Sequence, residues 1–341
     1  MRLPPAALLG GDPPPQCSPS AVAVAENSSR QPSPGWSPRP MDSSNGRGPL
    51  PRVLAGPGGP AADVLGGLPC ADLTTLQLEV ARRRAAKLRG PDVLRRYRED
   101  RFTTPAPLAF DVLRRVEDAL LSAAPAEFDR VTLSPVTPLG AHSTVAGLAQ
   151  HRVVPTGRGT EVAADPANGL ALEAAVRRSG STPVRLATVQ RVVRAQPPAP
   201  GLFAHFSLFA AITAGRDRGS LSFEREHLIE HARLLTTAVR AAGARAAGFQ
   251  MTTLDTRFAD FTASVQESLP DVAVSDAPDR AVGRNYYSGL CFTVTADFGS
   301  GLTPVGDGGF TPWTARLLGN AKERLLISGI GVDRVASLLN A

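Results

Sequence analysis

The stretch HLIEH, residues 227–231, has the residue types and spacing of a zinc-binding helix. Histidines at i and i+4 share one helix face and can hold a metal ion while the glutamate activates water. The longer stretch FEREHLIEHARLL is equally typical of a solvated helix that pairs acidic residues with arginines, here Glu226 and Glu230 with Arg225 and Arg233. Because a pattern with three fixed positions arises easily by chance, no zinc or other metal site is expected.

The stretch RNYYSGLCFTVTA, residues 284–296, holds two of the chain's 3 tyrosines, Tyr286 and Tyr287. Adjacent tyrosines before an apolar run are typical of a half-buried strand. The same pair could also line a small-molecule pocket, and the residues alone leave both interpretations open. A glycine-rich phosphate loop, a GxSxG elbow and a CxxC pair are absent from the sequence, so the common motifs of nucleotide, acyl and metal chemistry do not apply.

Composition limits the class of protein. The 341 residues are 43% hydrophobic, but no apolar run approaches the roughly 18 to 20 residues that span a bilayer. The three cysteines, Cys17, Cys70 and Cys291, are far apart and form neither a disulfide framework nor a zinc knuckle. The sequence therefore predicts a soluble protein of the reducing cytoplasm with no membrane partner.

The N-terminal segment differs in composition from the rest of the chain. Residues 1–60 contain 14 of the 31 prolines and almost no periodic apolar pattern. Residues 1–68 are therefore expected to be disordered, and Met41 is an alternative start that would leave residues 1–40 untranslated. The folded domain is expected to cover residues 69–341, beginning with a helix that Asp72 caps.

One basic segment carries the excess of positive charge. The formal net charge is +6, and residues 82–101 alone contain nine basic and three acidic residues. Such a segment could contact phosphates or an acidic partner, although arginines on a solvated helix face are commoner.

Helix and strand patterns then alternate along the chain. Val112, Leu113, Val116 and Leu120 recur at helical spacing, and FDRVTLSPV reads as a strand that ends at Pro135. Further strands are predicted at 185–196, 202–215, 246–254 and 291–298, a long amphipathic helix at 223–242, and a strand feeding a helix at 324–339. The adjacent strands 185–196 and 202–215 predict a hairpin and hence antiparallel pairing.

Four of these elements together resemble the catalytic core of histidyl-tRNA synthetase, a class II aminoacyl-tRNA synthetase, over about residues 90–341. RNYYSGLCF is similar to the family's histidine loop, VVRAQPPAPGLFAHF to its motif 2, and GIGVDRV to its motif 3. The helix at 107–124 and the strand ending at Pro135 resemble motif 1, which forms the family's dimer. The resemblance implies an α+β fold, a mainly antiparallel sheet of six or seven strands flanked by helices.

The resemblance assigns candidate ATP-binding residues. Arg194 and Arg334 occupy the two arginine positions that grip ATP from motifs 2 and 3, and ATP with Mg is the implied cofactor. Cations at the triphosphate are what adenylate formation requires. Gln196 stands where the family has an acidic residue, and Leu202 and Ala204 replace basic residues of the motif 2 loop. Half of the family's ATP clamp is therefore missing.

The amino-acid pocket departs further from the family. Ala167, Leu208 and Ile212 fall on the positions of its acidic and amide residues, so no pocket carboxylate is expected. Other candidate pocket residues are Tyr286, Tyr287, Gly308 and Gly309, the glycines ending a strand before Phe310, Thr311 and Pro312. Holding histidine requires buried acceptors, which these residues lack.

These departures, together with the expected absence of an anticodon-binding domain, argue against aminoacylation and against tRNA as a partner. The leading hypothesis is a non-catalytic protein similar to the regulatory subunit of ATP phosphoribosyltransferase, acting in histidine biosynthesis through a catalytic-subunit partner. The alternative is an ATP-dependent enzyme that adenylates a less polar carboxylic acid. A tRNA-binding domain without catalysis is a third possibility. In each case a homodimer through residues 105–140 is expected.

Overall fold

An eight-stranded sheet forms the centre of the protein, in the order β1-β4-β5-β10-β9-β8-β6-β7. The computed structural model describes residues 49–196, 203–281 and 286–340. The strands are β1 (Asp129–Arg130), β4 (Val184–Val193), β5 (His205–Arg216), β6 (Ala246–Thr253), β7 (Ala273–Asp276), β8 (Leu290–Asp297), β9 (Leu302–Thr311) and β10 (Glu323–Gly331). The six middle strands pair antiparallel, while β1 and β7 pair parallel at the two edges.

The predicted α+β class and antiparallel sheet are confirmed, but the predicted count of six or seven strands is wrong. The predicted hairpin is β4 paired with β5, in a register that joins Val193 to His205 and Val184 to Ala214. The additional strands are short edge strands, which carry too few residues to show a periodic pattern. The predicted motif 1 strand is reduced to the two residues of β1 and does not reach Pro135.

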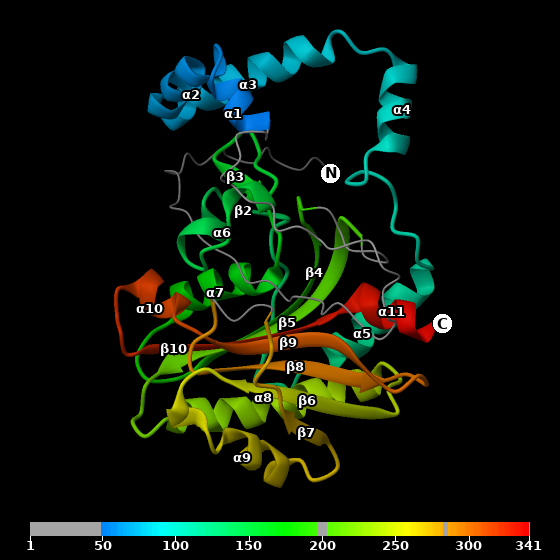
Figure 1. Ribbon diagram of the computed structural model, residues 1–341, viewed down its shortest axis with the longest axis vertical. Coiled ribbons are helices and arrows are strands. Elements are labelled where there is room, and N and C mark those ends of the chain that lie inside the picture. Colours follow the sequence, from blue (N-terminus) through cyan, green and yellow to red (C-terminus); the bar gives the residue numbers. More distant parts are fainter. Residues whose placement is uncertain (1–48, 197–202, 282–285, 341) are drawn as a thin grey trace, which may run out of the picture.

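Helices cover both faces of the sheet (Figure 1). The α8 face carries α5 (Phe110–Ser122), α8 (Ser222–Ala241) and α11 (Val332–Leu339), and the α7 face carries α7 (Pro166–Arg177) and α10 (Trp313–Leu318). Alternate residues of β5 point to opposite faces, so Phe209 packs on the α8 face and Ile212 on the α7 face. Two apolar cores therefore share one sheet.

Glycines in β9 allow close packing against its neighbours. A Cβ atom at Gly309 would lie 2.6 Å from Cδ1 of Tyr287 and 2.8 Å from Cβ of Cys291. A Cβ atom at Gly308 would lie 2.5 Å from the ring of Phe292 on the other face. Real side chains do not tolerate such distances, so both positions require glycine in this packing.

The first four helices form an arm at one end of the molecule (Figure 1). They are α1 (Pro49–Leu54), α2 (Gly58–Gly67), α3 (Cys70–Ala85) and α4 (Gly90–Glu99). None of the residues of α2, α3 or α4 is buried. Residue Pro69 precedes the first turn of α3, so Asp72 lies in that turn and does not cap it. The predicted domain boundary at residue 69 falls between α2 and α3, and residues 1–48 lie outside the described residues.

The segment after α4 fastens the arm to the tip of the β4–β5 hairpin. Arg101 donates from Nη1 to the Gln196 carbonyl at 3.0 Å and from Nη2 to the Ala195 carbonyl at 2.6 Å. On the other strand, Nε2 of His205 lies 2.6 Å from the Thr104 carbonyl oxygen. Both strands of the hairpin are therefore held by residues 101–104.

The remaining elements are small. They comprise a second sheet of β2 (Val136–Pro138) and β3 (Thr160–Val162), the helices α6 (Ala141–Thr144) and α9 (Phe261–Ser268), and the 3-10 turns η1 (Gln150–Arg152) and η2 (Thr256–Phe258). Within the described part of the chain, no helix has both the length and the apolar character needed to cross a membrane.

Candidate functional site

Arg194 lies just beyond the end of β4 and is paired with a buried aspartate. Its Nη2 donates to Oδ2 of Asp165 at 3.1 Å, and its Nε donates to the Ala164 carbonyl at 3.2 Å. Asp165 also caps α7 by accepting from the Ala167 backbone N–H at 3.1 Å. The side chains are 14% and 1% exposed. This candidate ATP-binding arginine is therefore engaged by a carboxylate of its own chain.

A second buried ion pair joins Arg280 to β9. Arg280 donates from Nη2 to Oδ2 of Asp307 at 2.7 Å and from Nη1 to the Thr293 hydroxyl at 2.9 Å. The two side chains are 10% and 1% exposed. Burial raises the pKa of Asp307 to about 7, even though Arg280 opposes the shift. The other oxygen, Oδ1, has no hydrogen-bond partner among the described residues.

The adjacent tyrosines belong to an aromatic cluster on the α7 face. The ring centroids of Tyr286 and Tyr287 are 4.3 Å apart, and Tyr286 stacks on Trp313 at 6.3 Å. Burial raises the pKa of both phenols well above the ordinary value, so both are neutral donors at physiological pH. Ala167, Ile212, Tyr287 and Trp313 lie in one buried apolar cluster, with Tyr286 packed against it.

The structure therefore brings together some of the predicted pocket residues. Ala167 and Ile212 lie beside the tyrosines, and Gly309 lies against Tyr287. Leu208 packs instead with Ala163 and Val192 in a separate small cluster. Gly308 approaches Phe292 on the α8 face, away from this cluster.

The two other candidate ATP-binding residues have different surroundings. The backbone carbonyl of Gln196 accepts from Arg101, and its side-chain Oε1 is buried with no hydrogen-bond partner in the described part of the chain. Arg334, in the first turn of α11, donates from Nε to the Pro304 carbonyl at 3.4 Å. The residues Val282, Arg284 and Asn285 of the histidine loop, and Leu202 of the motif 2 loop, lie outside the described residues.

The structure places two carboxylates in this region, at positions other than Ala167, Leu208 and Ile212. Asp165 and Asp307 are both buried there and both pair with arginines. One sequence signal points to Asp165, since an aspartate followed by Pro166 is typical of a helix start. Asp307 and Arg280 are 27 residues apart, and nothing local in the sequence indicates that they meet.

A third buried network supports the loop that carries Asp165. The carboxylate of Glu161 lies 2.5 Å from Nδ1 of His142 and accepts from Nε2 of Gln150 at 2.5 Å. On the other side of the ring, Nε2 of His142 accepts from the Ala164 backbone N–H at 3.0 Å. Burial opposes ionisation of Glu161, but these hydrogen bonds outweigh it and hold the Glu161 pKa below its ordinary value. The network fixes the backbone beside Arg194.

The HLIEH stretch lies within α8, and its two histidines are buried in a hydrogen-bond network. Nδ1 of His231 lies 2.7 Å from the Ser328 hydroxyl and Nε2 lies 2.9 Å from the Thr213 hydroxyl. Burial lowers the pKa of His231 to about 3, so its ring is neutral. Glu230 pairs with Arg185 at 2.7 Å and with Nδ1 of His227 at 2.8 Å. Both ring nitrogens of His231 are occupied by hydroxyl groups.

The predicted solvated face on this helix is also wrong in its pairs. Glu226 pairs with Arg218 rather than with Arg225, and Arg225 pairs with Asp260. Within the described ranges there is no group of three or more histidine, cysteine or acidic residues that could hold a metal ion.

Comparison with solved structures identifies the fold. A histidine–tRNA ligase subunit from Alicyclobacillus acidocaldarius has a TM-score of 0.51 and 17% identity, over 70% of this chain and 95% of that one. Apo histidyl-tRNA synthetase from S. aureus has a TM-score of 0.49 and 13% identity, over 68% of this chain and 65% of that one, so the match spans just under two thirds of that synthetase. An ATP phosphoribosyltransferase regulatory subunit/histidyl-tRNA synthetase from Bacillus halodurans has a TM-score of 0.49 and 12% identity, over 70% and 84%.

Sequence comparison adds no closer relation, because no family model and no curated protein matches the chain. The structural match to the Alicyclobacillus subunit covers 95% of that chain. At 17% identity this match concerns the fold and not the activity. The chain therefore has the fold of a histidyl-tRNA synthetase-like class II core, at 17% identity to this structure.

Proposed function

We propose that this chain is a regulatory or partner-binding subunit that has lost aminoacylation, of the ATP phosphoribosyltransferase regulatory type. It would act in histidine biosynthesis in the cytoplasm, as a homodimer that binds a phosphoribosyltransferase-type catalytic subunit. The observation that supports this best is the buried pair between Arg194 and Asp165. A tRNA partner is not part of the proposal.

The pair matters because ATP activation depends on cations that face the triphosphate. Arg194 gives Nη2 to Asp165 and Nε to the Ala164 carbonyl, so a phosphate would have to displace groups of the protein. Displacing Asp165 would leave a carboxylate that is 1% exposed without its partner. Breaking a buried pair in this way costs about 3 to 5 kcal/mol. The ion pair between Arg194 and the buried carboxylate of Asp165 therefore opposes ATP binding.

The surroundings of the candidate pocket residues also support a loss of enzymatic activity. An amino-acid substrate needs space for its side chain and acceptors for its ammonium group. Trp313 is fully buried in the cluster that contains Ala167 and Ile212. Asp165 and Asp307, whose charges both act on Tyr286, each already pair with an arginine. We infer that the chain's own side chains occupy the groups a substrate would use.

The arm supplies a surface for a protein partner. Its large exposed apolar residues are Leu50, Val53, Leu54, Val64, Leu76, Leu78, Val80, Val93, Leu94 and Tyr97. Arginines of α3 and α4 lie among them, including Arg82, Arg96 and Arg98. Because apolar side chains mixed with arginine are typical of protein interfaces, we propose that the catalytic subunit contacts this arm.

One observation favours the alternative, an ATP-dependent enzyme that adenylates a less polar acid. Arg194 and Arg334 remain at the positions that the resemblance assigns to ATP, with Mg as the accompanying ion. This alternative requires Asp165 to release Arg194 when ATP binds. The two proposals therefore differ in whether the natural sequence binds ATP while Asp165 keeps its charge.

Calorimetry of the full chain with Mg-ATP separates these two proposals. We expect no binding with a dissociation constant below about 1 mM for the natural sequence, and no pyrophosphate exchange with any carboxylic acid. Asp165→Asn keeps a helix cap but removes the charge, so ATP affinity should rise at least about tenfold as Arg194 is released. The double variant Asp165→Asn with Arg194→Ala is the control and should lose this gain. Exchange by the natural sequence would establish the enzyme instead.

A second measurement tests the regulatory role directly. The activity of an ATP phosphoribosyltransferase catalytic subunit from the same genome is measured with and without the full chain. We expect the full chain to change the catalytic rate by about tenfold or more, the range of coupling free energies found in allosteric complexes. Tyr97→Asp, which places a charge on the exposed face of α4, should abolish the effect, whereas Val176→Asp at an exposed position of α7 is the control. An unchanged rate would reject the regulatory proposal.

A further inference from the structure

The segment that follows α4 connects the arm to the end of β4, beside Arg194. Arg101 donates to the Ala195 carbonyl at 2.6 Å and to the Gln196 carbonyl at 3.0 Å. These are the two residues that come directly after Arg194. Hydrogen bonds from a charged guanidinium are stronger than those between neutral groups. The chain that leaves β4 is therefore held firmly by a residue at the base of the arm.

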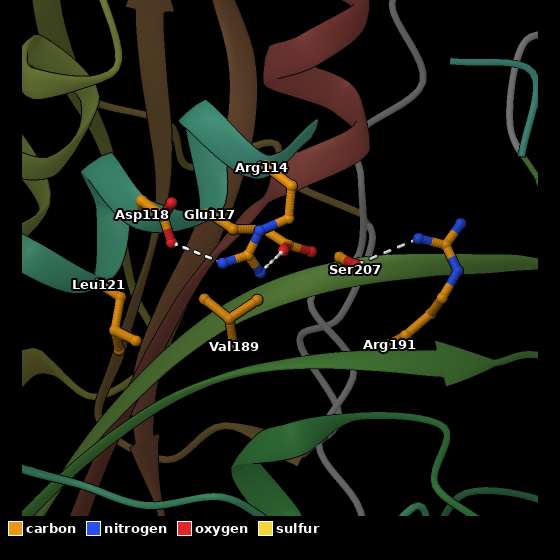
Figure 2. Close-up of a pocket in the computed structure, with 7 residues that line it drawn as sticks. All are labelled: Arg114, Glu117, Asp118, Leu121, Val189, Arg191 and Ser207. Atoms are coloured by element: carbon orange, nitrogen blue, oxygen red, sulfur yellow. Dashed lines mark hydrogen bonds and ion pairs between the residues drawn. The ribbon is translucent and has the colours of Figure 1, made fainter. Parts of the chain in front are cut away.

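The start of β5 is held by the same segment through His205. Nε2 of His205 lies 2.6 Å from the Thr104 carbonyl oxygen, and Nδ1 accepts from Nε of Arg191 at 3.0 Å. Because arginine only donates, Nδ1 carries no proton, and Nε2 is the donor to Thr104. Arg191 also donates to the Ser207 hydroxyl at 3.2 Å, the contact that Figure 2 draws between these two side chains. The ring is therefore fixed in the tautomer that bonds to Thr104.

Residues 100–104 form a compact turn that is bonded to the last turn of α4. The Asp100 carbonyl accepts from the backbone N–H of Thr103 at 3.0 Å and of Thr104 at 3.2 Å. The Thr103 hydroxyl lies 3.4 Å from the Tyr97 carbonyl oxygen of α4, to which it donates. Unwinding of α4 would therefore loosen the turn that presents Arg101 and Thr104 to the hairpin.

The hairpin end in turn fixes the backbone of Arg194. The Arg194 N–H donates to the Ala204 carbonyl at 2.9 Å, and the Ala195 N–H donates to the Arg152 carbonyl at 3.0 Å. The ion pair between the Arg194 side chain and Asp165 starts from this backbone. A change in the order of the hairpin end is therefore also a change in how firmly Arg194 is held.

The arm has no core of its own to keep it ordered. None of the residues of α2, α3 or α4 is buried. The helix next to the hairpin, α4, has 10 residues, and helices this short are marginal in water without a packing partner. A partner that covers the arm would therefore shift it towards its ordered state.

We propose that residues 101–104 are a latch through which the arm and the end of the β4–β5 hairpin become ordered together. A partner that binds the arm then tightens the hold on Arg194 without touching it. Sites coupled through shared order need no displacement between two structures. The inference rests on the proposed function only for the identity of the partner, because the coupling within this chain is measured without one.

Hydrogen exchange of the full chain, followed by mass spectrometry, measures this coupling. Arg96→Pro breaks α4 at an exposed position before the latch. The amides of residues 193–195 should then exchange at least about tenfold faster, because unwinding α4 loosens the latch. Arg101→Met keeps an apolar stem but has no donor, and it should speed exchange of the same amides by a similar factor.

The double variant shows whether the two effects share one route. Once Arg101→Met has opened the latch, adding Arg96→Pro should speed exchange of residues 193–195 by about threefold or less. Arg95→Met is the matched control, since it removes an exposed arginine that pairs with Glu99 at 3.3 Å within α4, and it should leave these amides unchanged. Full multiplication of the two effects, or no response of residues 193–195 to Arg96→Pro, would overturn the inference.

Exchange elsewhere in the sheet shows whether each variant keeps its fold. The amides of β6 and β8 lie far along the sheet from the latch and should exchange as in the natural sequence. A variant that loses this protection is replaced by a milder one, Arg96→Gly or Arg101→Lys. Both should act in the same direction with smaller factors, because glycine only weakens a helix and lysine lacks the forked pair of donors.

The same measurement with a phosphoribosyltransferase catalytic subunit separates this inference from the proposed function. Binding at the arm should slow exchange of α3 and α4 in the natural sequence and in Arg101→Met alike. Exchange of residues 193–195 should slow only in the natural sequence, where the latch is intact. No protection of α3 and α4 would reject docking at the arm and leave the latch to be decided by the variants alone. Protection of the arm without any change at residues 193–195 would reject the latch.

Discussion

Replacing Arg280 with methionine is expected to lower the free energy of unfolding by about 3 to 5 kcal/mol at pH 8. Methionine keeps much of the apolar stem but removes the charge that Asp307 contacts at 2.7 Å. Asp307 is 1% exposed, so its carboxylate would be left in the core without a countercharge. Urea denaturation of the full chain measures the loss.

The same variant should recover stability as the pH falls. The pKa of Asp307 is about 7 in the folded protein, well above the ordinary aspartate value of about 3.9. A carboxyl with a higher pKa in the folded state binds its proton more tightly there, so lowering the pH favours folding. Removing Arg280 raises the pKa of Asp307 further, so the loss caused by Arg280→Met should shrink as the pH falls towards about 7, by up to about 1.4 kcal/mol per pH unit, and stay constant below that pH, where both proteins gain stability equally.

Two further variants identify the cause. Arg280→Met combined with Asp307→Asn removes both charges and should restore most of the lost stability, because a neutral pair does not need a countercharge. Arg240→Met removes an arginine from an exposed pair, 2.8 Å from Asp271, and should cost less than about 1 kcal/mol. A loss that is independent of pH, or equal in Arg240→Met, would show that packing rather than charge explains the effect.

The ion pair also shows what the sequence could not reveal. The hairpin, the long helix α8, and the strand β10 feeding α11 were all predicted within a few residues, because each has strong local periodicity. In contrast β9 is rich in glycine and contains Pro304, so its pattern is weak, and only the family resemblance placed Gly308 and Gly309 at a strand end. Asp307 lies in that weak strand.

The prediction of the candidate site was likewise only partly successful. Tyr286, Tyr287, Ala167 and Ile212 do lie together, as the resemblance implied. The resemblance considered only the positions of the family's own acidic and amide residues, so it gave no indication of carboxylates elsewhere. The carboxylates came from other positions, Asp165 at the cap of the helix that carries Ala167, and Asp307 on β9. Burial of a charge is decided by contacts between distant segments, which local patterns do not record.

Trp313→Ala is expected to lower the free energy of unfolding by about 3 to 5 kcal/mol, the usual cost of removing a large aromatic side chain from a core. Trp313 is 0% exposed and stacks on Tyr286, so its removal leaves an apolar space beside the tyrosines. Trp313→Phe keeps a ring in this position and should lose less. Thermal denaturation of the full chain measures both losses.

Added indole distinguishes an opened pocket from a collapsed one. A cavity left in the apolar cluster that contains Ala167, Ile212 and Tyr287 can bind an apolar ring, as engineered apolar cavities do. A ligand that binds only the folded state raises the apparent stability by mass action, about 2.7 kcal/mol at 100 times its dissociation constant. Indole should therefore raise the unfolding midpoint of Trp313→Ala and leave the natural sequence unchanged. That result would support the proposal that Trp313 fills space that a substrate side chain would need. Equal responses to indole would remove this argument and leave the Arg194–Asp165 pair as the support for the proposal.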